Sequence, residues 1–144
     1  MALEKYNKKR KFRETSEPEG KISKKSGNRF VIQKHNASHL HYDFRLELDG
    51  VLKSWAVPKN LSKTKNQKRL AVQTEDHPVD YIDFQGEIPE GNYGAGTVEI
   101  YDKGKFELID RSDKKIIFNL KGDKFRGEYV LINFRDKNWL IFMR

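Results

Sequence analysis

The feature that most constrains the fold is a strictly alternating stretch from Leu40 to Leu48, which reads LHYDFRLEL. Apolar and ionisable residues take turns along its whole length, and a two-residue period predicts a β-strand with one buried face. The other face of this strand carries an imidazole, a guanidinium and two carboxylates in one row, from His41, Asp43, Arg45 and Glu47. Any fold for this chain must accommodate that row.

Short β-rich runs separated by turn residues continue through most of the chain. The pair Asp49-Gly50 predicts a type I′ turn, because both central residues of that turn need a positive φ. The run Val51 to Val57 should therefore return antiparallel to the alternating stretch. Further runs of this kind cover residues 30–32, 70–74, 97–101, 105–109, 115–120, 128–133 and 138–143. Their spacing predicts an all-β sandwich or barrel with one or two short peripheral helices.

Two segments between these runs are predicted to be bends. The sequence Asp102-Lys103-Gly104 should reverse the chain between the runs 97–101 and 105–109. The glycines at 91, 94 and 96 resemble a phosphate-binding loop only superficially, because neither the lysine and hydroxyl ending of such a loop nor a dinucleotide fingerprint is present. A glycine-rich bend that leads into a strand is the better interpretation.

Composition limits the partners and the kinds of site. A chain of 144 residues with a formal charge of +8 favours one domain and a polyanionic partner, such as nucleic acid or an acidic membrane surface. The absence of cysteine excludes disulfides and thiolate zinc sites, so any metal must be bound by His, Asp or Glu. No run approaches the roughly 20 apolar residues of a membrane helix, and no signal-peptide core is present. We therefore expect a cytoplasmic protein that does not enter a membrane.

We expect a basic, partly ordered arm over residues 1–27 and a β-barrel domain over residues 28–144. The arm has nine Lys or Arg against four Glu, and a short helix within 3–12 would place Leu3 and Tyr6 on one side. Such a helix is marginal alone, so the arm either docks on the domain or remains a charged tail. The segment 59–69, with five basic and no acidic residues, is predicted to be a loop that either grips phosphate or is simply solvated.

The histidine-rich stretch is a candidate metal site. His41 and Asp43 share one strand face with their Cα atoms about 7 Å apart, which suits two ligands of one ion. A bend at residues 36–38 would bring His35 in as a third ligand, and two histidines with one carboxylate suit manganese, iron or zinc. His39 has the same parity and could compete. The alternative is an ordinary half-buried strand whose polar face lies in water.

Two further residues could act beside this site. Arg45 is the next residue on the same face, and its planar guanidinium suits phosphate oxygens. His77 is the remaining histidine and precedes a proline. By residue type alone, a single histidine in that setting is more often structural than catalytic.

Two long blocks, RFVIQKHNASHLHYDFRLELDGVLKSWAVPK and RLAVQTEDHPVDYIDFQGEIPEGNYGAGTVEIYDKG, resemble the 3′-phosphoesterase domain found in bacterial DNA ligase D and as a free-standing protein. The resemblance implies a compact antiparallel β-barrel with a polar central cavity. It also implies a manganese-dependent enzyme, with zinc or cobalt as alternative ions, that removes a 3′-terminal ribonucleoside and then the 3′-phosphate in strand-break repair. The implied partners are nucleic acid 3′ ends, a separate ligase and end-joining proteins, around a monomeric protein.

Carried over position by position, the resemblance assigns roles to nine residues. The metal ligands are His35, His41 and Asp43; the phosphate-site residues are Arg45, Arg69, His77 and Tyr81; the residues of the diesterase step are Arg10 and Glu17. His39 matches no functional position. The chain departs from the family at Lys11, where the family has an acidic residue, and in its last residues, WLIFMR.

Two other functions are compatible with the same residues. The chain could be a non-enzymatic β-barrel module that binds nucleic acid ends through its basic segments, or a metal-dependent nuclease that cuts within strands. All three proteins would bind nucleic acid in a salt-sensitive way, because phosphate contacts release counterions. Only the enzymes would show turnover that a chelator abolishes.

Overall fold

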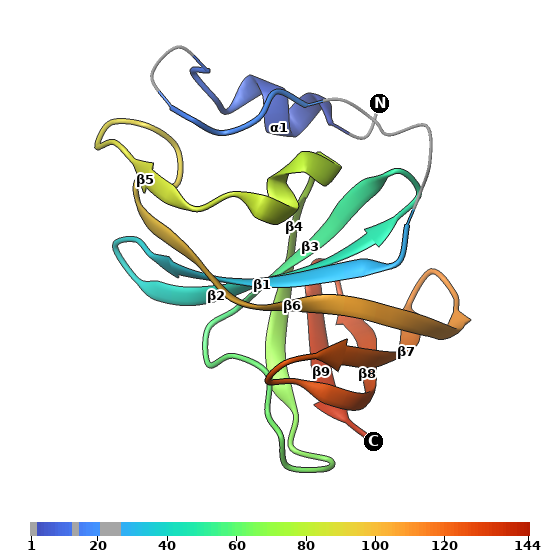
Figure 1. Ribbon diagram of the computed structural model, residues 1–144. Helices are drawn as coiled ribbons and strands as arrows, with labels where there is room; N and C mark the ends of the chain where they lie inside the picture. Colours follow the sequence, from blue (N-terminus) through green and yellow to red (C-terminus); the bar gives the residue numbers. More distant parts are fainter. Residues whose placement is uncertain (1–2, 13–14, 21–26) are drawn as a thin grey trace.

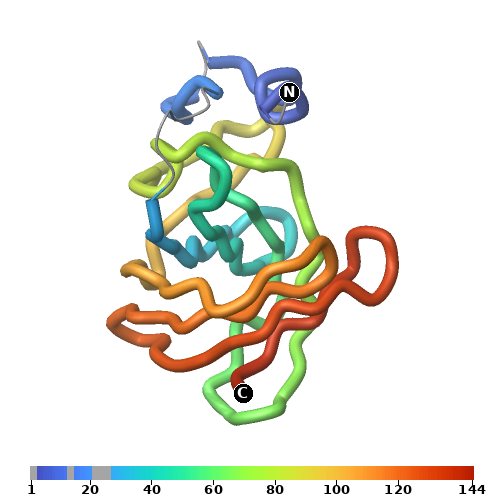
Figure 2. Tube along the Cα trace, turned by 90° about the vertical axis from the view of Figure 1, so that its right-hand side faces the viewer, coloured from blue at the N-terminus to red at the C-terminus, as the bar shows by residue number. Residues whose placement is uncertain are grey.

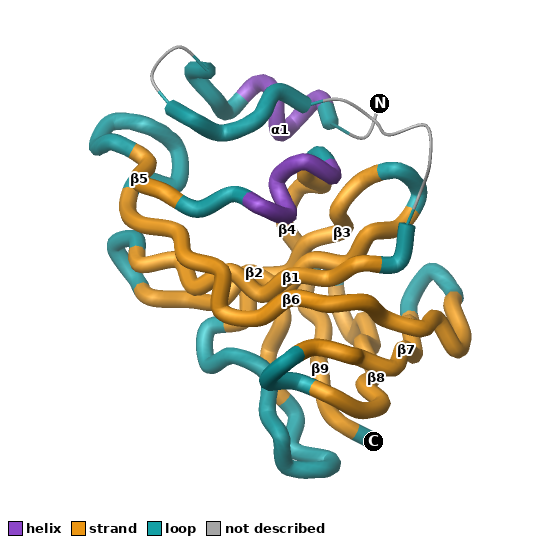
Figure 3. Tube along the Cα trace, viewed as in Figure 1, coloured by secondary structure: helices purple, strands orange, loops and turns teal. Residues whose placement is uncertain are grey.

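The computed structural model describes residues 3–12, 15–20 and 27–144, and is almost entirely β-sheet (Figure 1). The strands are β1 (Arg29–Asn36), β2 (Leu40–Leu48), β3 (Val51–Val57), β4 (Arg69–His77), β5 (Gly86–Ile88), β6 (Gly96–Arg111), β7 (Lys115–Gly122), β8 (Arg126–Arg135) and β9 (Asn138–Met143). The helices in the described parts are α1 (Glu4–Lys8) and the single 3₁₀ turn η1 (Val79–Asp83), drawn in purple in Figure 3. None of the helices seen there is long and apolar enough to cross a membrane.

Eight strands close into an antiparallel barrel. Their order is β1-β2-β3-β4-β9-β8-β7-β6, and β6 pairs again with β1, so the sheet has no free edge within this ring. The short strand β5 pairs with the beginning of β6. The predicted all-β barrel with short peripheral helices is confirmed.

The hairpin that the sequence predicts after the alternating stretch is present. Asp49 and Gly50 have φ values of 57° and 77°, as a type I′ turn requires. β2 and β3 pair from Tyr42↔Val57 to Leu48↔Val51 without a register shift. This uninterrupted pairing fixes which side chains of β2 share a face.

The turn predicted at residues 102–104 is wrong, because β6 runs through it as one strand. Asp102 is buried and does not make a turn of its own; its carboxylate accepts the backbone N–H groups of the β7–β8 turn, from Asp123, Lys124 and Phe125, at 3.0, 3.2 and 2.9 Å. Gly104 lies against the carbonyl of Lys121, where a side chain would collide. Asp102 and Gly104, which suggested a turn, instead allow β6 to pack against β7 and the β7–β8 turn.

Replacement of Asp102 by Ala is expected to destabilise the barrel by about 2 kcal/mol, because one buried and two part-buried N–H groups lose their acceptor. Urea unfolding measures the difference. The control is Asp113→Ala, since Asp113 is exposed in the β6–β7 connection. A loss below about 1 kcal/mol for Asp102→Ala would mean that water replaces the carboxylate.

The barrel interior is apolar. All eight strands of the ring contribute alternate side chains to one cluster, which includes Phe30, Ile32, Phe44, Leu46, Trp55, Val57, Ala71, Phe106, Phe118, Leu120, Tyr129, Leu131, Trp139 and Ile141. Because Phe44 and Leu46 point inward, the ionisable residues between them on β2 point outward through the wall. The polar cavity therefore lies outside the barrel wall and not in the interior of the barrel.

A second layer covers this outer face of the barrel. α1, η1 and β5 lie on this side of the barrel (Figures 1 and 2). They share a second apolar cluster with residues of β1, β3 and β6: Leu3, Tyr6, Val31, Val51, Leu52, Tyr81, Ile82, Phe84, Ile88 and Val98. α1 lies within the predicted range 3–12 but has only five residues. A helix of this length is not stable alone, so the burial of Leu3 and Tyr6 stabilises it. The described parts of the arm are thus docked on the barrel. The predicted boundary between arm and barrel domain, at residue 27, adjoins residues outside the described ranges and stays a prediction.

Candidate metal and phosphate site

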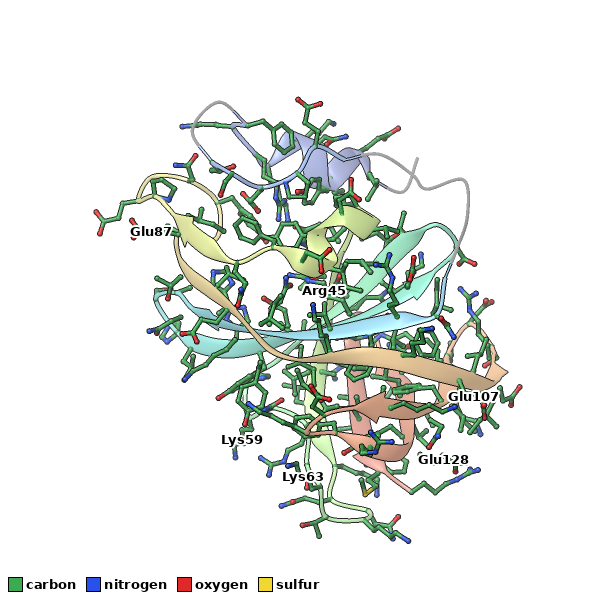
Figure 4. The ribbon with its side chains drawn as sticks, in the orientation of Figure 1. Arg45, Lys59, Lys63, Glu87, Glu107 and Glu128 are labelled. Atoms are coloured by element: carbon green, nitrogen blue, oxygen red, sulfur yellow. The ribbon has the colours of Figure 1, made fainter. Side chains whose placement is uncertain are left out.

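A cavity of about 230 Å³ lies between the barrel wall and the covering layer. Eight of the nine residues assigned by the resemblance line it: Arg10, Glu17, His35, His41, Asp43, Arg45, His77 and Tyr81. They come from the arm, β1, β2, β4 and η1. Figure 4 shows Arg45 in the middle of the molecule, on the side of the wall that faces this layer.

Three of these residues form the part of the cavity suited to a cation. His35 is brought beside His41 by the β1–β2 hairpin, in which the two are directly paired. The potential ligand atoms of His35, His41 and Asp43 lie within 4.8 Å of one another. Asp43 Oδ2 is 3.4 Å from His35 Nδ1 and 3.3 Å from His41 Nε2. Two imidazole nitrogens and one carboxylate oxygen therefore converge on one point.

The far side of each imidazole is held by a backbone carbonyl. His35 Nε2 lies 2.7 Å from the carbonyl oxygen of Gly94, and His41 Nδ1 lies 3.1 Å from that of His39. A carbonyl only accepts hydrogen bonds, so these nitrogens carry protons. His35 Nδ1 and His41 Nε2 face Asp43: each donates to the carboxylate when its ring is protonated, and each would offer a lone pair to a bound cation when its ring is neutral. Outer hydrogen bonds of this kind orient metal-ligating histidines, so the donor set fits a divalent cation. His39 takes part only through its backbone; its side chain is exposed.

The carboxylate of this cluster is held in its anionic form. Burial raises the pKa of Asp43. The charge of Arg45, whose Nη2 lies 3.6 Å from Asp43 Oδ2, and the hydrogen bonds from His35 and His41 lower it by more, so the pKa lies well below its usual range. The hydrogen bond to Asp43 raises the pKa of His41. The site thus keeps a negative charge where a cation would bind.

Arg45 is buried and fixed by a residue that sequence reasoning missed. Its Nε donates to Gln33 Oε1 at 2.7 Å, and Gln33 Nε2 donates to the carbonyls of Tyr81 and Phe84 at 2.9 and 3.1 Å. Gln33 thereby ties the guanidinium to η1. The signal was present, because Gln33 lies two residues before His35 on the same face of β1.

His77 forms the opposite wall of the cavity, between two arginines. Its Nε2 is 3.2 Å from Arg10 Nη2, and its Nδ1 is 2.9 Å from the carbonyl of Glu75. An arginine has only donors, so Nε2 accepts from Arg10, while Nδ1 faces both the Glu75 carbonyl and Arg45 Nη1, which lies 3.2 Å away. Burial, followed by the charges of Arg45 and Arg10, holds the pKa of His77 well below its usual value. His77 is therefore neutral at physiological pH.

The lowered pKa of His77 predicts a pH effect on stability. Between pH 7.5 and 5.5 the unfolded chain takes up a proton at His77 and the folded chain does not, so stability falls as the pH falls, by about 1 kcal/mol from this group. Urea unfolding at the two pH values should show that His77→Asn lacks this part of the loss, while the other histidines contribute equally to both proteins. Equal losses in the two proteins would mean that His77 titrates normally.

Arg10 connects the arm to the cavity through buried ion pairs. Its Nε lies 3.0 Å from Glu17 Oε2 and its Nη1 3.2 Å from Glu75 Oε1, while the Tyr6 ring packs 3.9 Å from the guanidinium carbon. The Tyr81 hydroxyl donates to Glu17 Oε2 at 2.8 Å, and burial raises the pKa of Tyr81. Glu75 was also missed by sequence reasoning, although it shares the strand face of His77 on β4.

Arg69 is not brought to the cavity. It begins β4, and His77 ends the same strand, so eight residue steps place the two roughly 26 Å apart. Arg69 pairs with Ile141 of β9 near the basic loop at the opposite end of the barrel (Figure 1). The structure therefore gives no contact between Arg69 and the other residues assigned to the phosphate site.

The chain is similar to known proteins over most of its length. Residues 33–133 match the family described as the DNA Ligase D 3′-phosphoesterase domain. The chain is 50% identical over 145 aligned residues to the multifunctional non-homologous end joining protein LigD of Pseudomonas aeruginosa. The alignment covers 94% of this chain and 17% of that protein. The LigD proteins of Mycolicibacterium smegmatis and Mycobacterium tuberculosis are 49% and 46% identical over 94% and 96% of this chain, and 19% of each protein is covered.

The matched range includes the cavity residues of β2, β4 and η1 and those of β1 from Gln33 onward. The chain spans less than a fifth of the length of these relatives. The region of His35, His41 and Asp43 thus lies inside the matched segment. The chain belongs to the DNA ligase D 3′-phosphoesterase domain family.

Proposed function

We propose that this protein is a metal-dependent phosphoesterase that processes 3′ ends of broken nucleic acid strands. The observation that carries the proposal is the convergence of His35 Nδ1, His41 Nε2 and Asp43 Oδ2 beside the guanidinium of Arg45. Relatives named as end-joining proteins support a role in end joining. The substrate would be a DNA or RNA/DNA 3′ end, and sealing would fall to a separate ligase.

His35, His41 and Asp43 would hold the ion, with manganese as the first choice and zinc or cobalt as alternatives. A divalent cation bound there would polarise a phosphoryl oxygen and lower the pKa of a coordinated water. Arg45 would offset the charge that builds on the phosphoryl group. Because Gln33 already fixes Arg45, little reorganisation is needed when the phosphate enters.

His77 would act as a positioning residue. A buried neutral imidazole with a lowered pKa does not store a proton at neutral pH, so His77 is a poor general acid. Its Nε2 holds Arg10, and the ring packs edge-on against Tyr81 with 4.7 Å between the ring centroids. We propose that His77 keeps the arginine and the tyrosine facing the phosphate.

Arg10 and Glu17 would act in the diesterase step, when a terminal ribonucleoside is still attached. Glu17 is buried, lines the cavity, and has one carboxylate oxygen, Oε1, without a hydrogen-bond partner among the described residues. A buried acceptor without a donor is costly. A ribose hydroxyl of the terminal nucleoside would supply that donor, which explains why the arm packs against the catalytic cavity.

A primer that ends in one ribonucleotide and is labelled at its 5′ end tests the proposal. With manganese, we expect the loss of one nucleoside to leave a 3′-phosphate, followed by conversion to a 3′-hydroxyl, and a chelator should stop both steps. Internal cuts would instead indicate a nuclease. An unchanged primer that still binds the protein would indicate a non-enzymatic end-binding module.

A further inference from the structure

An exposed aromatic side chain lies at the mouth of the cavity and has no role in the site described so far. Tyr93 belongs to the glycine-rich segment between β5 and β6, and 48% of its surface is exposed. It lines the catalytic cavity and also an adjoining groove of about 570 Å³ between α1 and β4. Tyr93 therefore lies where a strand would leave the site.

The segment that carries Tyr93 is fixed to the metal cluster. The carbonyl of the next residue, Gly94, accepts the hydrogen bond from His35 Nε2 at 2.7 Å. Gly94 has a φ of 76°, and a Cβ atom there would lie 3.4 Å from His35 Cε1. Gly96, with a φ of 138°, lies so close to the carbonyl of Asn36 that a side chain would collide. Because these glycines have no side chain, the segment can lie close against β1. Tyr93 is therefore next to Gly94, whose carbonyl binds His35.

Positive charge accompanies the ring. Lys9 Nζ lies over the Tyr93 ring, 4.5 Å from its centroid, and also pairs with Glu75 Oε2 at 3.3 Å. The Arg10 guanidinium carbon lies over the ring at 5.3 Å. Lys5 and Lys137 line the adjoining groove, together with carboxylates that include Glu75. An exposed aromatic ring with flanking cations is the arrangement by which proteins bind single-stranded nucleic acid, because every base can stack on the ring and the phosphates meet the cations.

We propose that Tyr93 is a stacking platform for the base of the 3′-terminal nucleotide, with Lys9 on the adjacent backbone. The proposal rests on the proposed function, because the strand is oriented by its phosphate in the cavity. It assigns Tyr93 to substrate binding and not to the chemical step. Since a stacked ring does not read base edges, the platform accepts any base.

Fluorescence of 2-aminopurine measures the stacking directly, without metal and without turnover. A single-stranded oligonucleotide carries a 3′-phosphate and 2-aminopurine as its last base, and binding is followed in chelator. Wild type and Tyr93→Phe should quench the terminal probe, whereas Tyr93→Ala should bind roughly tenfold more weakly and not quench it. Phe134→Ala, which removes a ring that is 53% exposed on β8, is the matched control and should behave as wild type.

Kinetics separate failure of this proposal from failure of the proposed function. With manganese and a 3′-phosphorylated oligonucleotide, Tyr93→Ala should raise KM roughly tenfold and change kcat less than about twofold. The same substitution should leave KM unchanged for an oligonucleotide whose last residue is abasic. Equal KM values for wild type and Tyr93→Ala on the 3′-phosphorylated oligonucleotide would overturn the stacking proposal. Absence of chelator-sensitive turnover in wild type would overturn the proposed function alone, because the quenching of 2-aminopurine is measured without turnover.

Discussion

Replacement of Asp43 by Asn is expected to reduce the proposed metal-dependent phosphoesterase activity by more than about 100-fold, because changes to residues that only orient metal ligands cost 10–100-fold and Asp43 lies in the cluster itself. Asn has nearly the same shape, but it removes the negative charge and places an amide where two histidine nitrogens converge. Manganese affinity, measured by titration calorimetry, should fall together with the turnover of a 3′-phosphorylated oligonucleotide.

His39→Ala is the matched control for this substitution. His39 lies four residues from Asp43, and its side chain is exposed; only its backbone carbonyl contacts the cluster, through His41. Both manganese affinity and turnover should therefore stay at the wild-type level. If Asp43→Asn retained full chelator-sensitive activity, the assignment of the metal cluster would be wrong. Thermal unfolding of both variants separates a loss of binding from a loss of fold.

Replacement of Arg45 by Lys is expected to lower kcat by about 10²- to 10³-fold, the usual cost of one preorganised donor at a transition state. Lysine keeps the charge, but it cannot both donate to Gln33 and present a planar fork to the phosphate. The measurement is kcat at saturating manganese. Manganese affinity should change little, because Arg45 is not among the three converging ligands.

Arg29→Lys tests whether the effect of the Arg45 substitution is specific. Arg29 also comes from the β1–β2 hairpin and also pairs with a carboxylate, since its Nε lies 3.0 Å from Glu47 Oε1, but it does not line the cavity. Its replacement should leave kcat unchanged. A loss below tenfold for Arg45→Lys, or equal losses for both variants, would remove Arg45 from the phosphate site.

Much of the hairpin that carries the site is readable from the sequence. The period of two from Leu40 to Leu48 places His41, Asp43 and Arg45 on one face, and the Asp49-Gly50 pair predicts the turn that fixes β2 against β3. The absence of cysteine restricts the possible metal ligands to His, Asp and Glu. Local periodicity and turn chemistry act over a few residues, so they need no knowledge of the remaining chain.

Local sequence patterns do not predict the role of a residue whose contacts are distant in the sequence. Asp102 and Gly104 have the composition of a turn, yet β6 continues through them because Asp102 caps a turn about twenty residues further along the chain. Gln33 and Glu75 were missed for the same reason, since each is explained by a partner more than ten residues away. Arg69 shows the converse, because a residue assigned by resemblance lies at the far end of its strand from the cavity.

The sequence by itself determined that β2 has one apolar and one ionisable face, and that three potential metal ligands lie within nine residues. The tertiary structure decided which face looks into the barrel. Phe44 and Leu46 fill the apolar interior, so the ionisable face needs a second cover, and the docked arm, η1 and the Tyr93 segment provide it. Alternation defines two faces but not what covers them, because that depends on contacts between segments as distant as Arg10 and His77.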